Sequence, residues 1–323
     1  TFEGNQLDEK TSSSLFRRTN EIIKILTALK VKGETTDEIT GAVMAIREKM
    51  VHIEAPENTI DIVGTGGDGL NTLNISTASA IVVASIGIKV AKHGNRSVSS
   101  LSGASDILTE LGVNINISAD SAIKCLYDID ICFMFAPLYH SSFKHVAEAR
   151  SQLKTRTIFN ILGPLCNPAN VKNHLIGAYD KKLLLPMSQV LKNLGSNNSW
   201  LLHSNDGLDE ISISDETSVA KLHNGKIIED IINPYKHEIT PAPITKIIGK
   251  DPKYNAKELL KVLNGEPNAY RDIILINSAA AILITGNCHD LNEGINMASV
   301  AIDSKAALKK LDELREVTNK LRE

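Results

Sequence analysis

The sequence predicts an α/β protein: a small α-helical unit followed by a larger α/β domain with a mainly parallel central sheet. From about residue 59, short apolar runs alternate with helix-like stretches, which is typical of strand–helix–strand units with right-handed crossovers. Before that point, residues 20–50 carry only a helical pattern of apolar residues. With 323 residues the chain exceeds the usual size of a single core, which agrees with two domains.

The predicted elements follow in order along the chain. Residues 20–50 form two helices separated at Lys32–Thr36, with Thr36 as the N-cap of the second, and nothing indicates a helix in residues 1–15. Strands are expected at 60–63, 88–91, 113–117, 131–136, 175–179 and 199–203, and in a hairpin, 218–222 with 226–232, that turns at Asn224-Gly225. Helices are expected at 76–87, 103–111, 119–128, within 140–168, near 181–194, and at 255–264, 268–285 and 291–321.

Composition narrows the range of partners. The chain is 42% hydrophobic and 23% charged with a net charge of −3, which gives no bulk attraction to nucleic acid or a membrane surface. The four cysteines are scattered in apolar contexts and form no Cys-x-x-Cys pair, as expected of reduced, buried thiols. No apolar run reaches the length of a membrane span, and no signal-peptide pattern opens the sequence. We therefore predict a cytoplasmic protein.

A glycine-rich stretch dominates the sequence at Asp61–Ser79 (DIVGTGGDGLNTLNISTAS), where Gly64, Gly66, Gly67 and Gly69 fall within six positions. The pattern predicts a strand, a loop and then a helix. Glycines let backbone N–H groups turn inward, and the helix N-terminus adds unpaired N–H groups, so the loop suits a pyrophosphate. The alternative is a glycine turn that only joins two elements. Neither the Walker spacing nor the dinucleotide Gly-x-Gly-x-x-Gly spacing is present.

Two more clusters follow strand ends. Lys92–Ser100 (KHGNRSVSS) is basic and rich in hydroxyl groups, so it can bind a second anion, although a solvated turn has the same composition. Asp209 and Glu210 are adjacent carboxylates just beyond a strand. Beside a polyphosphate they suit Mg²⁺, with Asp68 and Ser76 as further oxygen donors. The alternative for the acid pair is a charged turn.

Three residues of the helical segment have side chains that are candidates for ligand or metal binding. Arg150 is set among apolar residues and has either a binding role or the structural role of bracing a neighbouring helix. His140 and His145 have no third metal-type residue at a suitable spacing, which argues against zinc.

With these motifs in place, the chain resembles the anthranilate phosphoribosyltransferase family. The resemblance rests on GTGGDGLNTLNISTASA (64–80), KHGNRSVSSLSGASDILTELG (92–112), FAPLYHSSFKHVAEARSQLKTRTIFNILGPLCNPA (135–169) and DGLDE (206–210), and covers the chain from about residue 20 onward. It implies transfer of a phosphoribosyl group from 5-phosphoribosyl 1-pyrophosphate (PRPP) to the amino group of anthranilate, a step of tryptophan biosynthesis. The sequence departs from the family at Ser141-Ser142, where proline and alanine are usual.

The resemblance also implies an organisation and a set of site residues. Residues 1–56 and the segment at about 140–168 would form the helical domain, 57–139 with 169–323 the α/β domain, and the helical domains would join a homodimer. The implied PRPP-binding residues are Gly64, Gly67, Asp68, Thr72, Asn74, Ile75, Ser76, Thr77, Lys92, His93, Gly94, Asn95, Arg96, Ser97, Val98, Ser99, Ser100 and Ala104. Anthranilate would lie near Gly64, Asn95, His140 and Arg150, and Mg²⁺, two ions per subunit, would be held by Ser76, Asp209 and Glu210.

Two other functions have to be weighed. A pyrimidine nucleoside phosphorylase shares the architecture, but a different lysine–serine phosphate loop and no Asp-Gly-Leu-Asp-Glu turn would be expected. A non-catalytic nucleic-acid-binding relative would need a basic groove and no acid pair, contrary to this composition. No catalytic base is identified and none is needed, because the aromatic amine of anthranilate is already neutral at pH 7.

Overall fold

The computed structural model describes residues 9–96 and 101–321. Within these residues one seven-stranded sheet has the order β3-β2-β1-β4-β5-β6-β7, in which β1 to β5 are parallel and β6 and β7 antiparallel. The strands are β1 Ile60–Gly64, β2 Val90–Gly94, β3 Ile131–Phe135, β4 Asn173–Gly177, β5 Asn198–Ser204, β6 Thr217–His223 and β7 Lys226–Ile232. The predicted mainly parallel sheet is confirmed.

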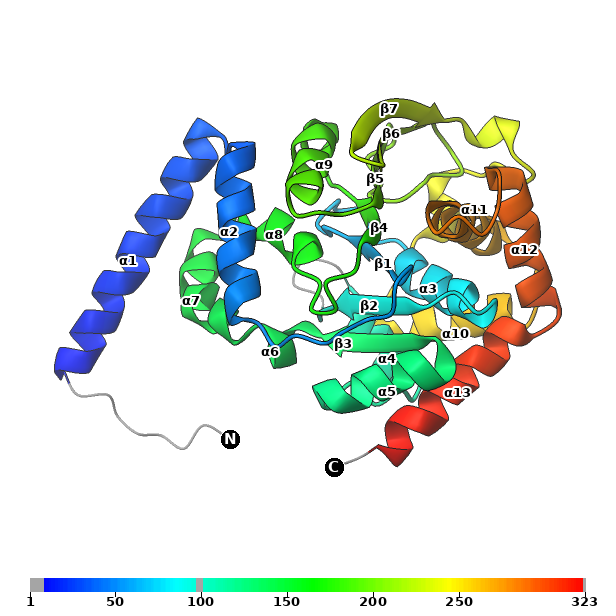
Figure 1. Cartoon of the computed structure of the whole chain (residues 1–323), viewed down its shortest axis with the longest axis horizontal. Coiled ribbons are helices and arrows are strands. Elements are labelled where there is room, and N and C mark those ends of the chain that lie inside the picture. The colour runs from blue at the N-terminus through cyan, green and yellow to red at the C-terminus, as the bar shows by residue number, and fades with distance from the viewer. Residues whose placement is uncertain (1–8, 97–100, 322–323) are drawn as a thin grey trace.

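Helices cover both faces of this sheet (Figure 1). They are α1 Glu9–Lys32, α2 Thr36–Lys49, α3 Ile75–Ser85, α4 Ala104–Glu110, α5 Ala119–Ile129, α6 Ala136–Tyr139, α7 Lys144–Leu153, α8 Phe159–Leu165, α9 Leu184–Asn193, α10 Pro252–Leu263, α11 Ala269–Ile284, α12 Leu291–Asp303 and α13 Ala306–Lys320. Helices α1, α2, α7 and α8 gather on one side of the molecule, and α3 and α10–α13 on the other. No helix in the described ranges is both long and apolar enough to cross a membrane.

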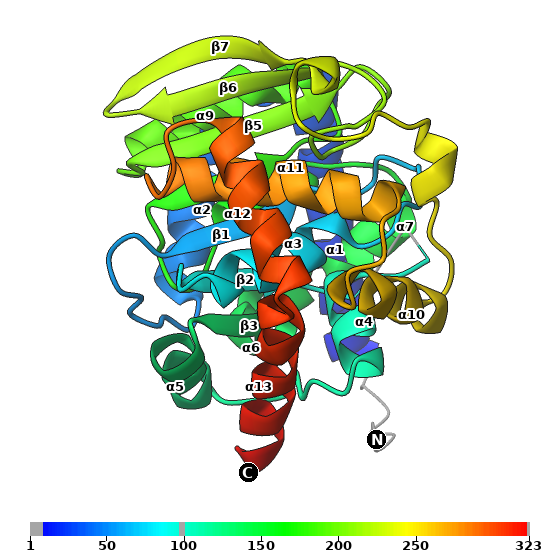
Figure 2. The ribbon, with the colours of Figure 1, turned by 90° about the vertical axis from the view of Figure 1, so that its right-hand side faces the viewer.

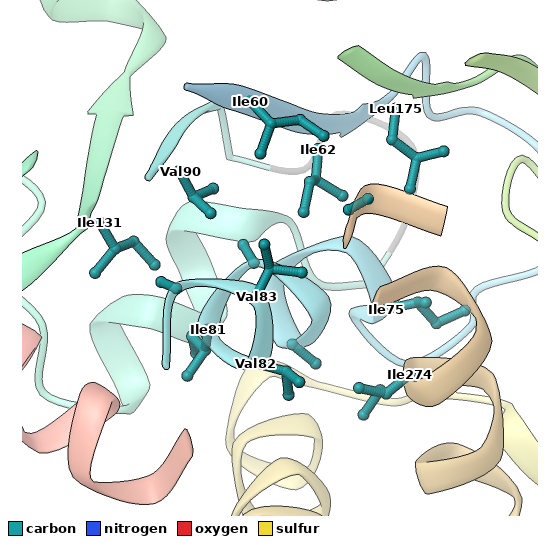
Figure 3. Packing of buried hydrophobic residues seen from close by; sticks show 14 of the residues in the cluster. Ile60, Ile62, Ile75, Ile81, Val82, Val83, Val90, Ile131, Leu175 and Ile274 are labelled. Carbon is teal, nitrogen blue, oxygen red and sulfur yellow. The ribbon is translucent and has the colours of Figure 1, made fainter. Parts of the chain in front are cut away.

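The central helix α3 explains why the sheet is buried. Nine of its eleven residues, between Ile75 and Ala84, are buried, so the helix is apolar all round and needs partners on every side. Figure 3 shows Val83 facing the strand residues Ile60, Ile62 and Val90, while Ile75 and Val82 lie towards Ile274 of α11. Helices α11, α12 and α13 pack over its outer surface (Figure 2). Because α3 starts directly after the glycine-rich loop, this packing fixes where the loop ends.

A second core lies on the opposite face. Ile39 and Val43 of α2 and Leu162 of α8 pack with Met187 of α9 and with residues of β4 to β6, among them Ile176. The helices near the N-terminus and the segment that contains α8 are therefore tied to the sheet and to each other through one shared apolar cluster.

Local signals account for most element boundaries. Thr35 caps α2, because its side chain accepts from the Glu38 N–H (3.2 Å) while Glu38 accepts from the Thr35 N–H (3.0 Å). The expected cap, Thr36, is one residue too late. The hairpin between β6 and β7 turns at Asn224 and Gly225, as predicted, with φ angles of 48° and 73° that this turn requires.

Several predicted elements are wrong or displaced. Residues 113–117 form no strand: Val113, Ile115 and Ile117 are buried alternately, but Asn114 bonds to Thr318 of α13 rather than to a strand. The alternation of buried and exposed residues therefore comes from packing on one side of an extended segment that pairs with no strand.

Helix boundaries differ as well. The predicted helix 291–321 is two helices, α12 and α13, because Lys305 between them adopts φ 65° and the chain turns so that α13 packs against α3 and α5. Helix α1 begins at Glu9, earlier than the sequence indicated. Strand β2 lies two to three residues later than predicted and β4 two residues earlier, because polar residues at the strand ends also pair.

The strand order creates a crevice. After β1 the chain builds β2 and β3 on one side, then returns to place β4 on the other side of β1. In such sheets ligands bind at the carboxyl ends of the strands where the order reverses. Gly64 and Gly177 are the paired last residues of β1 and β4, so they mark this point.

Candidate functional site

The glycine-rich loop leaves the sheet at the switch point. Gly66, Gly67 and Gly69 have φ angles of 64°, 76° and 81°, which residues with a side chain rarely adopt, so this backbone path needs glycine. Thr65 anchors the loop to β4, because its N–H donates to the Gly177 carbonyl (2.8 Å) and its hydroxyl accepts from the Tyr179 N–H (3.0 Å).

The acidic turn lies across the ends of β1 and β4. The Asp209 carboxylate accepts a hydrogen bond from the Gly66 N–H (2.9 Å). A Cβ on Gly64 would lie 2.5 Å from the Asp209 Oδ2, and a Cβ on Gly177 would lie 1.5 Å from the Asp209 carbonyl oxygen. Both strands must therefore end in glycine to admit the turn. The predicted acid pair and glycine-rich loop, 143 residues apart in sequence, are in direct contact.

Neighbouring polar residues hold the turn in place. Asp206 accepts hydrogen bonds from the hydroxyl groups of Ser212 (2.6 Å) and Ser214, and these bonds outweigh burial and lower its pKa. Asn277 of α11 is completely buried; it donates to the Ile211 carbonyl and accepts from the Ile211 N–H, both at 2.9 Å. The residue after Glu210 is thus fixed by helix α11.

The carboxyl groups of Asp68, Asp209 and Glu210 lie close enough to influence one another, and Glu210 also interacts with the Lys92 ammonium. Burial, followed by the charge of Asp68, raises the pKa of Asp209 to about 7, and burial together with Asp209 raises the pKa of Glu210 well above its usual value. Burial likewise raises the pKa of Asp68. The Lys92 ammonium is also buried, which lowers its pKa, while Asp61 and Glu210 oppose that shift. Because negative groups outnumber positive ones, the cluster favours a cation.

Residues at the start of α3 lie beside Lys92 and the glycine-rich loop. Lys92 reaches the Ser76 hydroxyl (3.2 Å) and the Ile62 carbonyl, so β1, β2 and α3 meet at its ammonium group. Asn74 is bonded through its side chain to Ser102 and to Asn255 (2.9 Å). These bonds fix Asn74, which joins the glycine-rich loop to α3.

The other predicted PRPP-binding residues near the start of α3, Thr72, Ile75 and Thr77, offer a ligand mainly their backbone groups. The side chains of Ile75 and Thr77 are buried, and Thr72 forms an isolated β-bridge with Ile248. Their N–H groups near the start of α3 are the parts that suit an anion.

The second predicted loop is described only in part. Gly94 ends β2, and a Cβ there would lie 2.9 Å from the Phe133 ring and 3.1 Å from the Ala104 Cβ, so it packs closely against α4. Asn95 accepts from the Arg96 N–H (2.7 Å), and Arg96 lies 3.7 Å from Asp106 of that helix. The predicted Ser97, Val98, Ser99 and Ser100 lie outside the described residues.

Two of the predicted acceptor residues, His140 and Arg150, lie in a row with aromatic rings beside β2. The Nε2 atoms of His93 and His140 are 3.1 Å apart, and burial lowers the pKa values to about 3 and about 4, so both imidazoles are neutral. His140 stacks on Phe143 (ring centroids 5.1 Å), which meets Phe159 edge-on at 5.6 Å. The Arg150 guanidinium lies 5.5 Å from the centroid of the Phe159 ring.

Arg150 is half-buried and lies against the Phe159 ring. Burial lowers its pKa, yet within the described ranges its guanidinium has no hydrogen bond or ion pair to the protein. An arginine that only braced a helix would bond to carbonyl or carboxylate oxygens of its neighbours. Its donor groups are thus available for a carboxylate.

Sequence reasoning missed the buried Asp61 behind this row. Its carboxylate accepts from the Asn167 side chain (2.7 Å) and the His93 N–H (3.3 Å), and burial raises its pKa to about 6. A signal was present, because an acidic residue between Ile60 and Ile62 in a buried strand requires hydrogen-bonding partners. Asp61 therefore ties β1 to the strand that carries Lys92 and His93.

Comparisons with known proteins agree with this geometry. The model of the glycosyl transferase family, a/b domain, matches residues 56–308. The anthranilate phosphoribosyltransferase of Bradyrhizobium diazoefficiens is 46% identical over 295 residues, covering 91% of this chain and 88% of the relative. The enzyme of the same name from Rhodopseudomonas palustris is 48% identical over 290 residues, covering 90% and 86%.

Solved structures extend the similarity to the fold. Anthranilate phosphoribosyltransferase from Thermus thermophilus has a TM-score of 0.88 at 30% identity, covering 98% of this chain and 97% of that one. The Saccharomyces cerevisiae enzyme, in complex with PRPP and Mg, has the same TM-score and identity and covers 98% and 88%. On family model, sequence and fold together, this chain belongs to the anthranilate phosphoribosyltransferase family.

Proposed function

We propose that this chain transfers the phosphoribosyl group of PRPP to the amino group of anthranilate, giving N-(5-phosphoribosyl)anthranilate and pyrophosphate for tryptophan biosynthesis. The observation that carries the proposal is the acidic turn laid on the glycine-rich loop, with Asp209 bonded to Gly66 beside the buried Lys92. This arrangement suits a metal-bound pyrophosphate. The acceptor follows from the family, since the yeast relative is known both with PRPP and Mg and with 4-fluoroanthranilate.

On the donor side, backbone groups would bind the pyrophosphate. N–H groups of Gly67 and Asp68 and of the first turn of α3 are positioned by the glycine-rich loop, and the partial positive charge of the helix N-terminus favours an anion. Lys92 would supply a fixed positive charge. The end of β2 and the residue after it, His93 through Asn95, would bind the ribose phosphate end of the donor.

We further propose that the enzyme depends on Mg²⁺, with two ions per subunit. Ser76, Asp209 and Glu210 fit this ion by donor chemistry, because Mg²⁺ prefers oxygen ligands and completes its shell with phosphate oxygens and water. The raised pKa values of the two carboxyl groups support the presence of a cation, since they arise from burial and mutual repulsion. When bound, the ion would neutralise charge on the departing pyrophosphate.

The reaction then needs positioning more than proton transfer. The neutral amine nitrogen of anthranilate donates its electron pair to the ribose C1 atom, and the bond from C1 to the pyrophosphate oxygen breaks with its electrons on that oxygen. The extra proton on nitrogen leaves to pyrophosphate or water. The chain would hold both substrates in line and stabilise the leaving anion through Lys92 and the loop N–H groups.

Arg150 is expected to bind the anthranilate carboxylate. Replacing it with alanine should raise the KM for anthranilate by about ten- to a hundredfold, because a charge-assisted bond contributes about 1.5–3 kcal/mol. PRPP affinity measured without acceptor should stay unchanged, and Lys144→Ala, an exposed cation on the same helix, serves as the control. A lower melting temperature with equal loss for both substrates would instead assign Arg150 to bracing the helix.

The proposed reaction is tested directly with the purified protein. Mixed with PRPP, Mg²⁺ and anthranilate, it should consume anthranilate, followed as the loss of its fluorescence. Phosphorolysis of a pyrimidine nucleoside, or nucleic-acid binding without turnover of anthranilate, would favour one of the two alternative functions. No activity in any of these assays would refute the proposal.

We also propose a cytoplasmic homodimer joined through the helical domain, residues 1–56 with about 140–168. Ile25, Val31 and Met44 of α1 and α2 are 59%, 82% and 59% exposed, so this domain offers apolar side chains that a partner subunit would cover. The four free, buried cysteines fit a reducing compartment. Sedimentation velocity should give a dimer that Val31→Glu dissociates; a monomeric wild type would contradict it.

A further inference from the structure

Arg156 connects the helical segment to the glycine-rich loop. It lies between α7 and α8, and its guanidinium donates a hydrogen bond to the Gly67 carbonyl. The same group lies 4.2 Å from the centroid of the Tyr179 ring, and the Tyr179 N–H is bonded to Thr65 in the loop. The side chain is largely exposed, but its charged end is fixed by a ring on one side and a loop carbonyl on the other.

The contact decides how one peptide group is oriented. In a trans peptide the C=O and the following N–H point in opposite directions, so holding the Gly67 carbonyl turns the Asp68 N–H away from Arg156. Gly66 and Gly67 both have positive φ, and without side chains this part of the backbone can rotate at little cost. The Asp68 carboxylate accepts from the Leu70 N–H and also lies within the field of the Arg156 charge. Arg156 bonds to the Gly67 carbonyl itself, and this bond favours one orientation of the Gly67–Asp68 peptide.

We propose that Arg156 is a positioning residue for PRPP: by holding the Gly67 carbonyl it keeps the Asp68 N–H turned towards the pyrophosphate. The inference rests on the proposed function of the loop. If the peptide rotated, a carbonyl oxygen would face the negatively charged donor and repel it. Arg156 belongs to the segment that also carries Arg150, so the contact joins that segment to the glycine-rich loop.

Two substitutions separate this role from a direct charge effect. Arg156→Gln keeps an N–H donor for the carbonyl but removes the charge, whereas Arg156→Met removes both. We expect Arg156→Met to weaken PRPP binding, measured by calorimetry without acceptor, by about tenfold or more, as for loss of a charge-assisted bond. Arg156→Gln should recover part of that loss, and the KM for anthranilate should change little. Lys182→Met, an exposed cation near Tyr179, removes the same charge and should bind PRPP as the wild type does.

Other results would overturn the proposal. If Arg156→Lys binds PRPP well and Arg156→Gln binds as poorly as Arg156→Met, the charge itself contacts the donor. If all variants melt lower and lose both substrates equally, Arg156 is a structural brace. Unchanged PRPP binding in Arg156→Met would refute the positioning role while leaving the reaction intact, whereas a wild type without anthranilate turnover would refute the proposed function. A crystal structure of Arg156→Met should show the Gly67–Asp68 peptide rotated.

Discussion

Replacing Asp209 with asparagine and Glu210 with glutamine together is expected to reduce turnover by at least about a hundredfold, the scale of losing a fixed electrostatic contribution to the transition state. The two carboxylates are the acid pair at the glycine-rich loop and the proposed Mg²⁺ ligands, so their loss would leave the pyrophosphate charge without the ion. Turnover and its Mg²⁺ dependence would be measured at saturating PRPP. The matched control, Asp215→Asn with Glu216→Gln, changes a neighbouring acid pair whose side chains bond to Asn205 and Asn233 and not to the glycine-rich loop, and it should stay active.

The same double variant is expected to melt higher than the wild type at pH 8 when Mg²⁺ and PRPP are absent. The pKa of Asp209 is raised from 3.8 to about 7, so the folded state binds this proton more tightly than the unfolded state. The stability that follows is complete below about pH 4 and is lost as pH rises through 7. Wild-type melting temperature should therefore fall between pH 5 and pH 8, and fall less in the variant. If the melting temperatures of the wild type and the variant fell equally with pH, or if the variant kept full activity, the assignment of Asp209 and Glu210 to the metal site would be wrong.

Replacing Gly177 with alanine is the second change with a large expected effect. Its φ is not in the left-handed region, so alanine is not strained by the backbone; the clash alone matters. The new Cβ would lie 1.5 Å from the Asp209 carbonyl oxygen, which forces the acidic turn away from the end of β4. We expect activity to fall by about a hundredfold and the free energy of unfolding by about 1–3 kcal/mol, as in overpacked cores.

A glycine without neighbours provides the control. Gly41 lies in α2 with no atom within 4 Å of the position of a Cβ, and alanine there should stabilise the helix by about 0.5–1 kcal/mol without changing activity. Kinetics and thermal melts of the two variants decide the matter. A Gly177→Ala enzyme with wild-type activity and melting temperature would mean that the turn does not cross the strand end so closely.

The sequence drew attention to the glycine-rich loop and the acid pair, which the structure brings into contact, because their signals are local. Glycine density, the strand before the loop and the helix after it lie within twenty residues, and hydrogen-bonding physics links such a pattern to anions. The acid pair was found for the same reason, since Asp209 and Glu210 are adjacent. Periodicity misjudged residues 113–117, because a buried extended segment alternates whether or not it pairs with a strand.

The predicted acceptor side depends on contacts between distant residues, which local sequence patterns do not predict. His140 and Arg150 were assigned to the acceptor only through the family resemblance, and the rings of Phe143 and Phe159 that join them were not singled out. A contact such as His93 with His140 joins residues 47 positions apart on separate elements. Nothing in either stretch alone signals the partner, because the pairing exists only once the helical segment packs beside β2.

By itself the sequence determined that this is an α/β protein with a mainly parallel sheet, and it singled out the glycine-rich loop and the adjacent acids as a predicted site, since each signal depends on residues close together in the chain. Tertiary structure alone decided that Gly64 and Gly177 end paired strands, that Asp209 fits over both, and that Arg156 reaches the Gly67 carbonyl. These contacts follow from the order in which the strands assemble. That order depends on long-range packing, which no local pattern of residues encodes.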